Sequence, residues 1–132
     1  MYDNKDWKYG FYYLYIDNTG KEFHNILNQE EKVIVNHLGG VVPVFTNVDK
    51  ETVGQYTGLK DKNGVEIYEG DIVAEKGHFV KSDRLVYQKI QWKENYSCWL
   101  RGEYQRLTPK NIKAYQIEVI GNIYENPDLL EE

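Results

Sequence analysis

Residues 55–73 read QYTGLKDKNGVEIYEGDIV, a pattern typical of short strands joined by turns. Two strand-like runs flank Asn63-Gly64, and Asn-Gly in this position is the strongest local signal for a tight hairpin because both residues tolerate positive φ. A second turn signal at residues 69–71 precedes another apolar run. The stretch therefore predicts closely spaced antiparallel strands.

The rest of the chain has a similar composition. It contains twelve Tyr and only two Ala, which favours strands over helices. Two more hairpins are expected, over residues 10–27 and 85–104. Thr108-Pro109 predicts the start of a short helix, with Thr as the N-cap and Pro at the first helical position. Residues 115–124 are largely apolar on both faces, which predicts a central, buried strand.

We therefore expect a mainly β protein, with a β-rich α+β arrangement as the alternative. Residues 52–132 are predicted to form a small, partly open antiparallel barrel of the SH3-like kind that ends in a short helical turn. Residues 1–51 are predicted to form an N-terminal β extension. The boundary is placed in the polar, aperiodic stretch around residues 47–52.

The size and composition of the chain exclude several classes of protein. With 132 residues, 41% hydrophobic and 28% charged, the composition is that of a globular protein with one main domain. No apolar run reaches the roughly 18 residues of a membrane span, and the chain does not open with a signal-peptide pattern. The single cysteine, Cys98, cannot form an internal disulfide. We expect a cytoplasmic protein with no membrane partner.

The sequence contains no pattern that predicts catalysis. The three histidines, His24, His37 and His78, lie in different predicted elements, and we identify no second ligand at metal-binding spacing. Neither serine has the flanking glycines of a nucleophile elbow, and Cys98 lies in a strand-like run where it packs as a small apolar side chain. We expect no catalytic, cofactor-binding or metal-binding residues, and we interpret the protein as a non-enzyme.

Residues 55–73, followed by residues 118–130, which read EVIGNIYENPDLL, resemble the YopX family of bacteriophage and prophage proteins. The resemblance implies a small, β-rich, phage-derived protein in a bacterial host cell whose members self-assemble, and it supplies no catalytic residues. Family members usually open with a short basic and aromatic segment. That segment ends in a Trp-Asp-like motif, and Asp6-Trp7 has the same two residue types in reverse order. In an alternative interpretation, residues 1–4 are the end of that opening segment.

Charge is unevenly distributed along the chain. Residues 76–113 carry a net charge of +6, and the remainder carries −11. Aromatic residues interleave with the basic ones in this segment, and a cationic aromatic surface is typical of single-stranded nucleic-acid binding. In that hypothesis the binding surface consists of Lys89, Trp92, Lys93, Trp99 and Arg101.

Self-assembly is the leading functional hypothesis. A basic middle and acidic ends in each subunit provide complementary patches for a homo-oligomer. Two adjacent leucines on a terminal turn are costly to leave in water, so the expected subunit contact consists of Tyr124, Leu129 and Leu130. Nucleic-acid binding is the first alternative, and an adaptor that binds a host or phage protein is the second.

Overall fold

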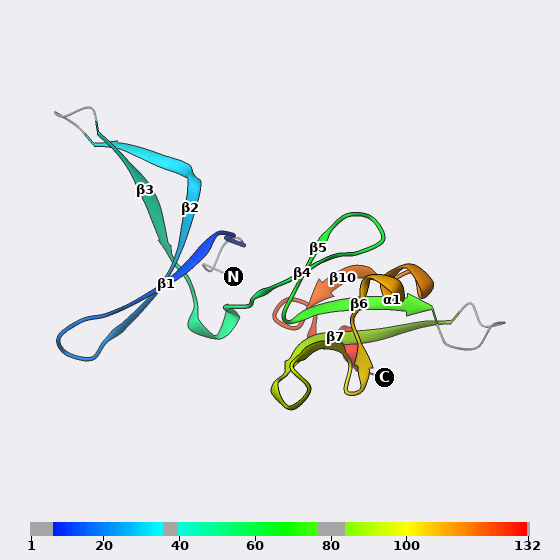
Figure 1. The fold of residues 1–132 in the computed structure, drawn as a ribbon. Helices are drawn as coiled ribbons and strands as arrows, with labels where there is room; N and C mark the ends of the chain where they lie inside the picture. Colours follow the sequence, from blue (N-terminus) through cyan, green and yellow to red (C-terminus); the bar gives the residue numbers. More distant parts are fainter. Residues whose placement is uncertain (1–6, 36–39, 77–83, 132) are drawn as a thin grey trace. The chain divides into compact units, whose positions relative to one another are not determined.

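The computed structural model describes residues 7–35, 40–76 and 84–131, and it divides the chain into two compact units, residues 1–53 and 54–132 (Figure 1). The sequence placed this boundary between residues 51 and 52. Both units are built mainly of antiparallel strands, which confirms the predicted mainly β class, and the sheets of the described residues are open and do not close into a barrel. Within the described ranges, no helix is long and apolar enough to cross a membrane.

The first unit is a three-stranded sheet with the order β1-β2-β3. The predicted hairpin over residues 10–27 is confirmed, since β1 pairs antiparallel with β2. Asp17 closes the turn between these strands, because its Oδ1 accepts hydrogen bonds from the backbone N–H groups of Thr19 and Lys21. The elements are β1 (Phe11–Ile16), β2 (Glu22–Val35), β3 (Gly40–Asn47) and the 3-10 turn η2 (Lys50–Thr52).

The described core of the first unit is small. It consists of Ile26 and Val48, with Val53 packed against them. The backbone N–H of Val48 donates to the carbonyl of His24 at 2.9 Å, which ties the chain after β3 to β2.

The second unit combines a hairpin, β4 with β5, and an open five-stranded sheet with the order β10-β6-β7-β8-β9. The predicted hairpin over residues 85–104 is confirmed as β7 and β8. The strands are β4 (Tyr56–Lys60), β5 (Glu66–Tyr68), β6 (Asp71–Lys76), β7 (Leu85–Lys93), β8 (Cys98–Arg101), β9 (Gln105–Arg106) and β10 (Glu118–Asn122), and a 3-10 turn, η3 (Glu94–Tyr96), joins β7 to β8.

The turn between β4 and β5 is built differently from the expected one. Gly64 has a φ of 83°, whereas Asn63 is not among the described residues with positive φ. The buried carboxylate of Asp61 organises this turn instead, because its Oδ1 accepts from the backbone N–H groups of Asn63 and Val65 at 2.8 and 2.9 Å. Its Oδ2 accepts from the N–H of Val119 at 2.9 Å and so joins the hairpin to β10.

A continuous apolar core lies between the five-stranded sheet and the elements that cover it. The helix α1 (Pro109–Ala114) contributes Ile112 to this core. Its predicted start is confirmed, since the side chain of Thr108 accepts a hydrogen bond from the N–H of Asn111 at 3.1 Å. The buried members of the core are Ile67, Val73, Ile90, Leu107, Ile112 and Ile117.

The last strand lies at an edge of the sheet, so the prediction of a central position is wrong. β10 pairs with β6 on one side, and its register shifts between Val119 and Gly121. This irregularity leaves Ile120 exposed. The apolar residues on both faces of β10 therefore belong to a bulged edge strand and not to a strand that is buried on both sides.

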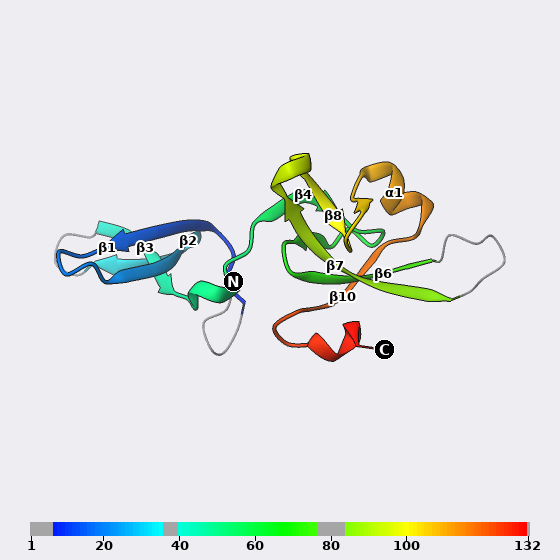
Figure 2. The same ribbon diagram turned by 90° about the horizontal axis from the view of Figure 1, so that it is seen from below.

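The C-terminal 3-10 turn η4 (Pro127–Leu130) confirms the predicted helical ending and lies against β7 of its own unit. In Figure 2, α1 and η4 lie on opposite sides of β6 and β7. The sheet is therefore covered, at least in part, on both faces.

Candidate functional site

The hairpin of β1 and β2 displays a row of aromatic side chains. Phe11, Tyr13 and Tyr15 alternate along β1 and therefore share one face, and they are 63%, 50% and 51% exposed. In the register, Tyr13 lies opposite Asn25 and Tyr15 opposite Phe23. We call this set of five side chains the aromatic face.

A shallow groove runs over part of the aromatic face. It has a volume of about 470 Å³ and is lined by Tyr13, Tyr15, Phe23 and Asn25. The rings of Tyr15 and Phe23 are 6.0 Å apart, and the Lys21 ammonium lies 5.1 Å from the centre of the Phe23 ring. The groove is thus mainly apolar, with one amide and one cation beside it.

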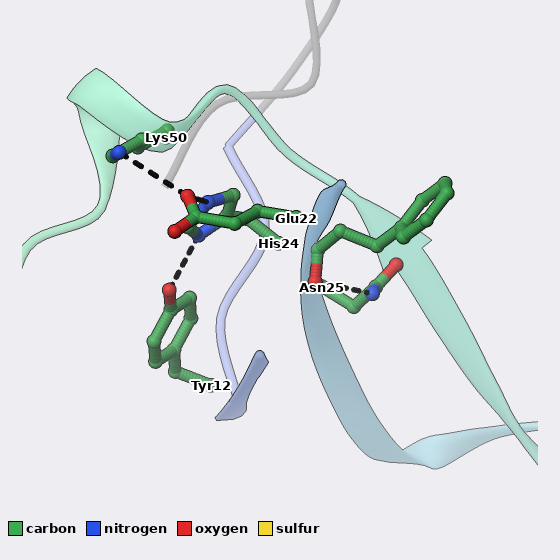
Figure 3. Close-up of polar contacts among 6 residues, drawn as sticks. Tyr12, Glu22, His24, Asn25 and Lys50 are labelled. Atoms are coloured by element: carbon green, nitrogen blue, oxygen red, sulfur yellow. Dashed lines mark hydrogen bonds and ion pairs between the residues drawn. The ribbon is translucent and has the colours of Figure 1, made fainter. Parts of the chain in front are cut away.

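The opposite face of the same hairpin carries a chain of polar contacts (Figure 3). The Tyr12 hydroxyl lies 2.5 Å from Nδ1 of His24, and Nε2 of His24 lies 3.1 Å from Oε2 of Glu22. The ammonium of Lys50, in η2, lies 3.2 Å from the same carboxylate oxygen. The rings of Tyr12 and His24 are also stacked, with centroids 5.9 Å apart.

We call the side chains of Tyr12, His24, Glu22 and Lys50 the polar chain. Its electrostatics favour an ionised Glu22 carboxylate. Its hydrogen bond with His24 and the nearby Lys50 cation lower the pKa of the Glu22 carboxyl. The His24 ring can join both neighbours, because one ring nitrogen can donate to Glu22 while the other accepts from the Tyr12 hydroxyl.

In the second unit, the residues predicted to bind nucleic acid do not come together. Side chains alternate along a strand, so Lys89 and Lys93 lie on the opposite face of β7 from Trp92. Trp92 pairs with Trp99 across the strands, and their rings are 5.2 Å apart. The predicted mixture of cations and aromatic rings is therefore divided between the two faces of the sheet.

Arg101, the fifth of these residues, is in the interior. Arg101 and Glu75 are each about 1% exposed as side chains, and the Arg101 guanidinium donates to the Glu75 carboxylate and to the backbone carbonyl of Arg106. Gln88 donates to the other carboxylate oxygen of Glu75 at 2.8 Å, and the guanidinium lies 5.0 Å from the ring of Tyr115. Arg101 thus holds the core together and cannot contribute to a surface.

The geometry can be compared with known proteins. A family model described as YopX protein matches residues 11–131. The chain belongs to the YopX family. The resemblance seen in residues 55–73 and 118–130 is thereby confirmed, and the match extends over most of the first unit.

A solved structure is similar to the chain over most of its length. The crystal structure of protein EF1440 from Enterococcus faecalis is similar to this YopX-family chain, with 27% sequence identity over 91% of this chain and 87% of that one, and a TM-score of 0.55. A search of curated proteins finds no match. The names of the family and of EF1440 state no activity, so any function must be argued from the chain's own surfaces.

The predicted subunit contact lies at the end of this YopX-family chain. Tyr124 and Leu130 are exposed, while Leu129 is half-buried in the turn that lies against β7. Burial and the charge of Glu69 raise the pKa of the Tyr124 hydroxyl. Two of the three residues are therefore accessible, although the turn is already packed on its own unit.

The sequence contains a signal for the polar chain that the predicted site residues did not include. Glu22 and His24 are two residues apart in a predicted strand, so their side chains share a face. Tyr12 is brought to them only by the register of the hairpin, which the sequence does not fix. His37 and His78 lie outside the described residues. Within the described ranges, no group of three or more His, Cys, Asp or Glu side chains could hold a metal ion.

Proposed function

We propose that this protein is a phage- or prophage-derived cytoplasmic binding protein that assembles into a homo-oligomer and acts without catalysis. The observation that carries the proposal is β1, an edge strand whose six side chains are all uncharged and all exposed. The polarised charge of the chain adds complementary patches for contact between copies.

The strand β1 carries none of the features that usually protect an edge strand in a monomeric protein. Edge strands normally carry charges, prolines or bulges, because their unpaired N–H and C=O groups otherwise pair with another strand. β1 reads FYYLYI, and its register with β2 is continuous from Phe11 to Ile16. Such an edge is favourable for pairing with a strand of another molecule.

The aromatic face adds apolar surface to that edge. Burying a large apolar side chain contributes on the order of 1.5–3 kcal/mol, and about half of this remains available at Tyr13 and Tyr15. In the described part of the first unit, Ile26 and Val48 are buried with Val53 packed against them, whereas the side chains of β1 stay exposed.

A second copy of the chain fits this surface better than a nucleic acid does. Two identical edge strands can pair antiparallel about a two-fold axis, and the uncharged β1 creates no repulsion at that axis. Nucleic acid requires accessible cations beside the aromatic rings, whereas β1 carries no charge and Lys21 lies over the Phe23 ring.

Light scattering coupled to size-exclusion chromatography tests the proposal. We expect a molar mass that is a multiple of 15.6 kDa. Tyr13→Lys should lower this mass because it places like charges near the two-fold axis. Val65→Lys is the matched control, since Val65 is 49% exposed in the hairpin of the second unit, close to the 50% of Tyr13. The control should leave the mass unchanged.

A third variant, Leu129→Asp with Leu130→Asp, tests the terminal contact expected from the sequence. If this variant lowers the mass and Tyr13→Lys does not, assembly stands but β1 is the wrong contact. A monomeric wild type overturns the assembly proposal. A peak with excess absorbance at 260 nm would instead favour the nucleic-acid alternative.

A further inference from the structure

The polar chain on the other face of the hairpin points to a property separate from assembly. We propose that Tyr12 is a nucleophile that His24 and Glu22 prepare for stoichiometric acylation by an activated acyl donor. The proposal rests on the contacts of these three side chains and not on the aromatic face.

The three groups have the arrangement of an activated nucleophile. A nucleophile needs a base within hydrogen-bond reach, and the base needs a third group that orients it. Tyr12 Oη is 2.5 Å from Nδ1 of His24, and Nε2 of His24 is 3.1 Å from Glu22. The His24 side chain is 11% exposed whereas Tyr12 is 44% exposed, so the base is enclosed and the nucleophile is accessible.

The acyl transfer is balanced by groups already in place. The phenolic oxygen of Tyr12 attacks the carbonyl carbon of the donor, and the phenolic proton moves to Nδ1 of His24. The bond between the carbonyl carbon and its leaving group then breaks, and the leaving group departs with its electron pair. Glu22 stabilises the imidazolium that forms at His24, and the product is an aryl ester on Tyr12.

The surroundings favour an uncharged electrophile. Lys50 contacts Glu22 at 3.2 Å, so its charge is already compensated and offers little to a phosphate group. An acyl donor needs no such cation. Tyr12, Glu22 and Lys50 are the titratable groups seen to face or adjoin His24 from β1, β2 and η2.

Acetylation by N-acetylimidazole, followed by peptide mass spectrometry, tests the proposal on the full chain. Tyr13 and Tyr15 are internal references, because they lie on the same strand but on the opposite face from His24. General-base assistance contributes on the order of 100-fold or more in enzymes, so we expect His24→Gln to slow Tyr12 acetylation by about tenfold or more. The rates at Tyr13 and Tyr15 should not change.

Glu22→Gln provides a second variant that keeps a hydrogen-bond acceptor but removes the charge. As a positioning residue, Glu22 should give an intermediate Tyr12 rate when changed to Gln, and a merely structural role predicts no difference between this variant and the wild type. Circular dichroism verifies that each variant folds. If His24→Gln does not fold, the rate measured for Glu22→Gln decides the outcome. An unchanged Tyr12 rate in the folded variants overturns the proposal, whatever the oligomeric state.

Discussion

The two units use their side chains in opposite ways. In the second unit, Arg101 and Glu75 are fully enclosed together with a continuous apolar core. In the first unit, the core cluster has only three described members, and every side chain of β1 is exposed. The second unit thus encloses even a pair of charges, whereas the first unit displays aromatic rings on its surface. Three predictions test this difference.

The largest effect is expected from breaking the buried ion pair. Arg101→Met leaves the Glu75 carboxylate in the core without its cation, and removing one partner of a buried pair costs about 3–5 kcal/mol. Urea unfolding followed by tryptophan fluorescence should show this loss, since Trp92 and Trp99 both lie in the second unit.

The matching double variant separates charge from packing. Glu75→Leu combined with Arg101→Met removes both charges, and an apolar replacement of a buried pair is often neutral or stabilising. We expect the double variant to recover most of the lost free energy of unfolding. If the single variant is as stable as the wild type, Glu75 and Arg101 do not hold the second unit together.

A second prediction compares two isoleucines that are equally buried. Ile26 in the first unit and Ile90 in the second are each 1% exposed. Ile90→Ala should lower the global stability of the second unit by about 2–5 kcal/mol, as for other large-to-small changes in a packed core. Ile26→Ala should instead release local amide protection, because Ile26 packs in a cluster separate from the core of the second unit.

Hydrogen exchange measured by mass spectrometry distinguishes these outcomes. We expect Ile26→Ala to speed exchange in β1 and β2 while β6 and β7 keep their protection. Accelerated exchange in both units would contradict the view that each has its own stability.

The sequence predicted what depends on short-range signals. Thr108-Pro109 started a helix where expected, and the hairpins over residues 10–27 and 85–104 formed as predicted, because caps and turns are determined within a few residues. The pairing of Glu75 with Arg101 joins residues 26 apart and depends on how β6, β7 and β8 align. No local pattern could reveal it.

The same limit applies to the predicted nucleic-acid surface, whose residues the structure does not bring together. A count of charges and rings over residues 76–113 ignores the alternation that places Lys89 and Trp92 on different faces. It also cannot show that Arg101 is enclosed. Family membership, in contrast, follows from long blocks of sequence and needs no register.

The smallest effect concerns pH, and its sign should differ between the units. Burial raises the pKa of Asp71, in the second unit, from 3.8 to about 6. Between these values the folded state keeps a proton that the unfolded chain has released, so Asp71 makes the second unit more stable as the pH falls from 6 towards 4. The gain is on the order of 2 kcal/mol. In the first unit, hydrogen bonds from Thr19 and Lys21 lower the pKa of Asp17, so its contribution is lost as the pH falls.

Asp71→Asn isolates this effect, because an amide oxygen can still accept from the Tyr68 N–H, which lies 2.8 Å from the carboxylate in the wild type. The variant should reduce the pH dependence of the unfolding free energy between pH 4 and 6, and it should be more stable than the wild type at pH 7.

Asp17→Asn is the matched variant in the first unit. It should reduce the acid-induced loss of amide protection in β1 and β2 and leave the second unit unchanged. If acid destabilises both units equally, the burial of Asp71 does not make the two units respond differently to pH. The difference in burial between the units would then not extend to their ionisable groups.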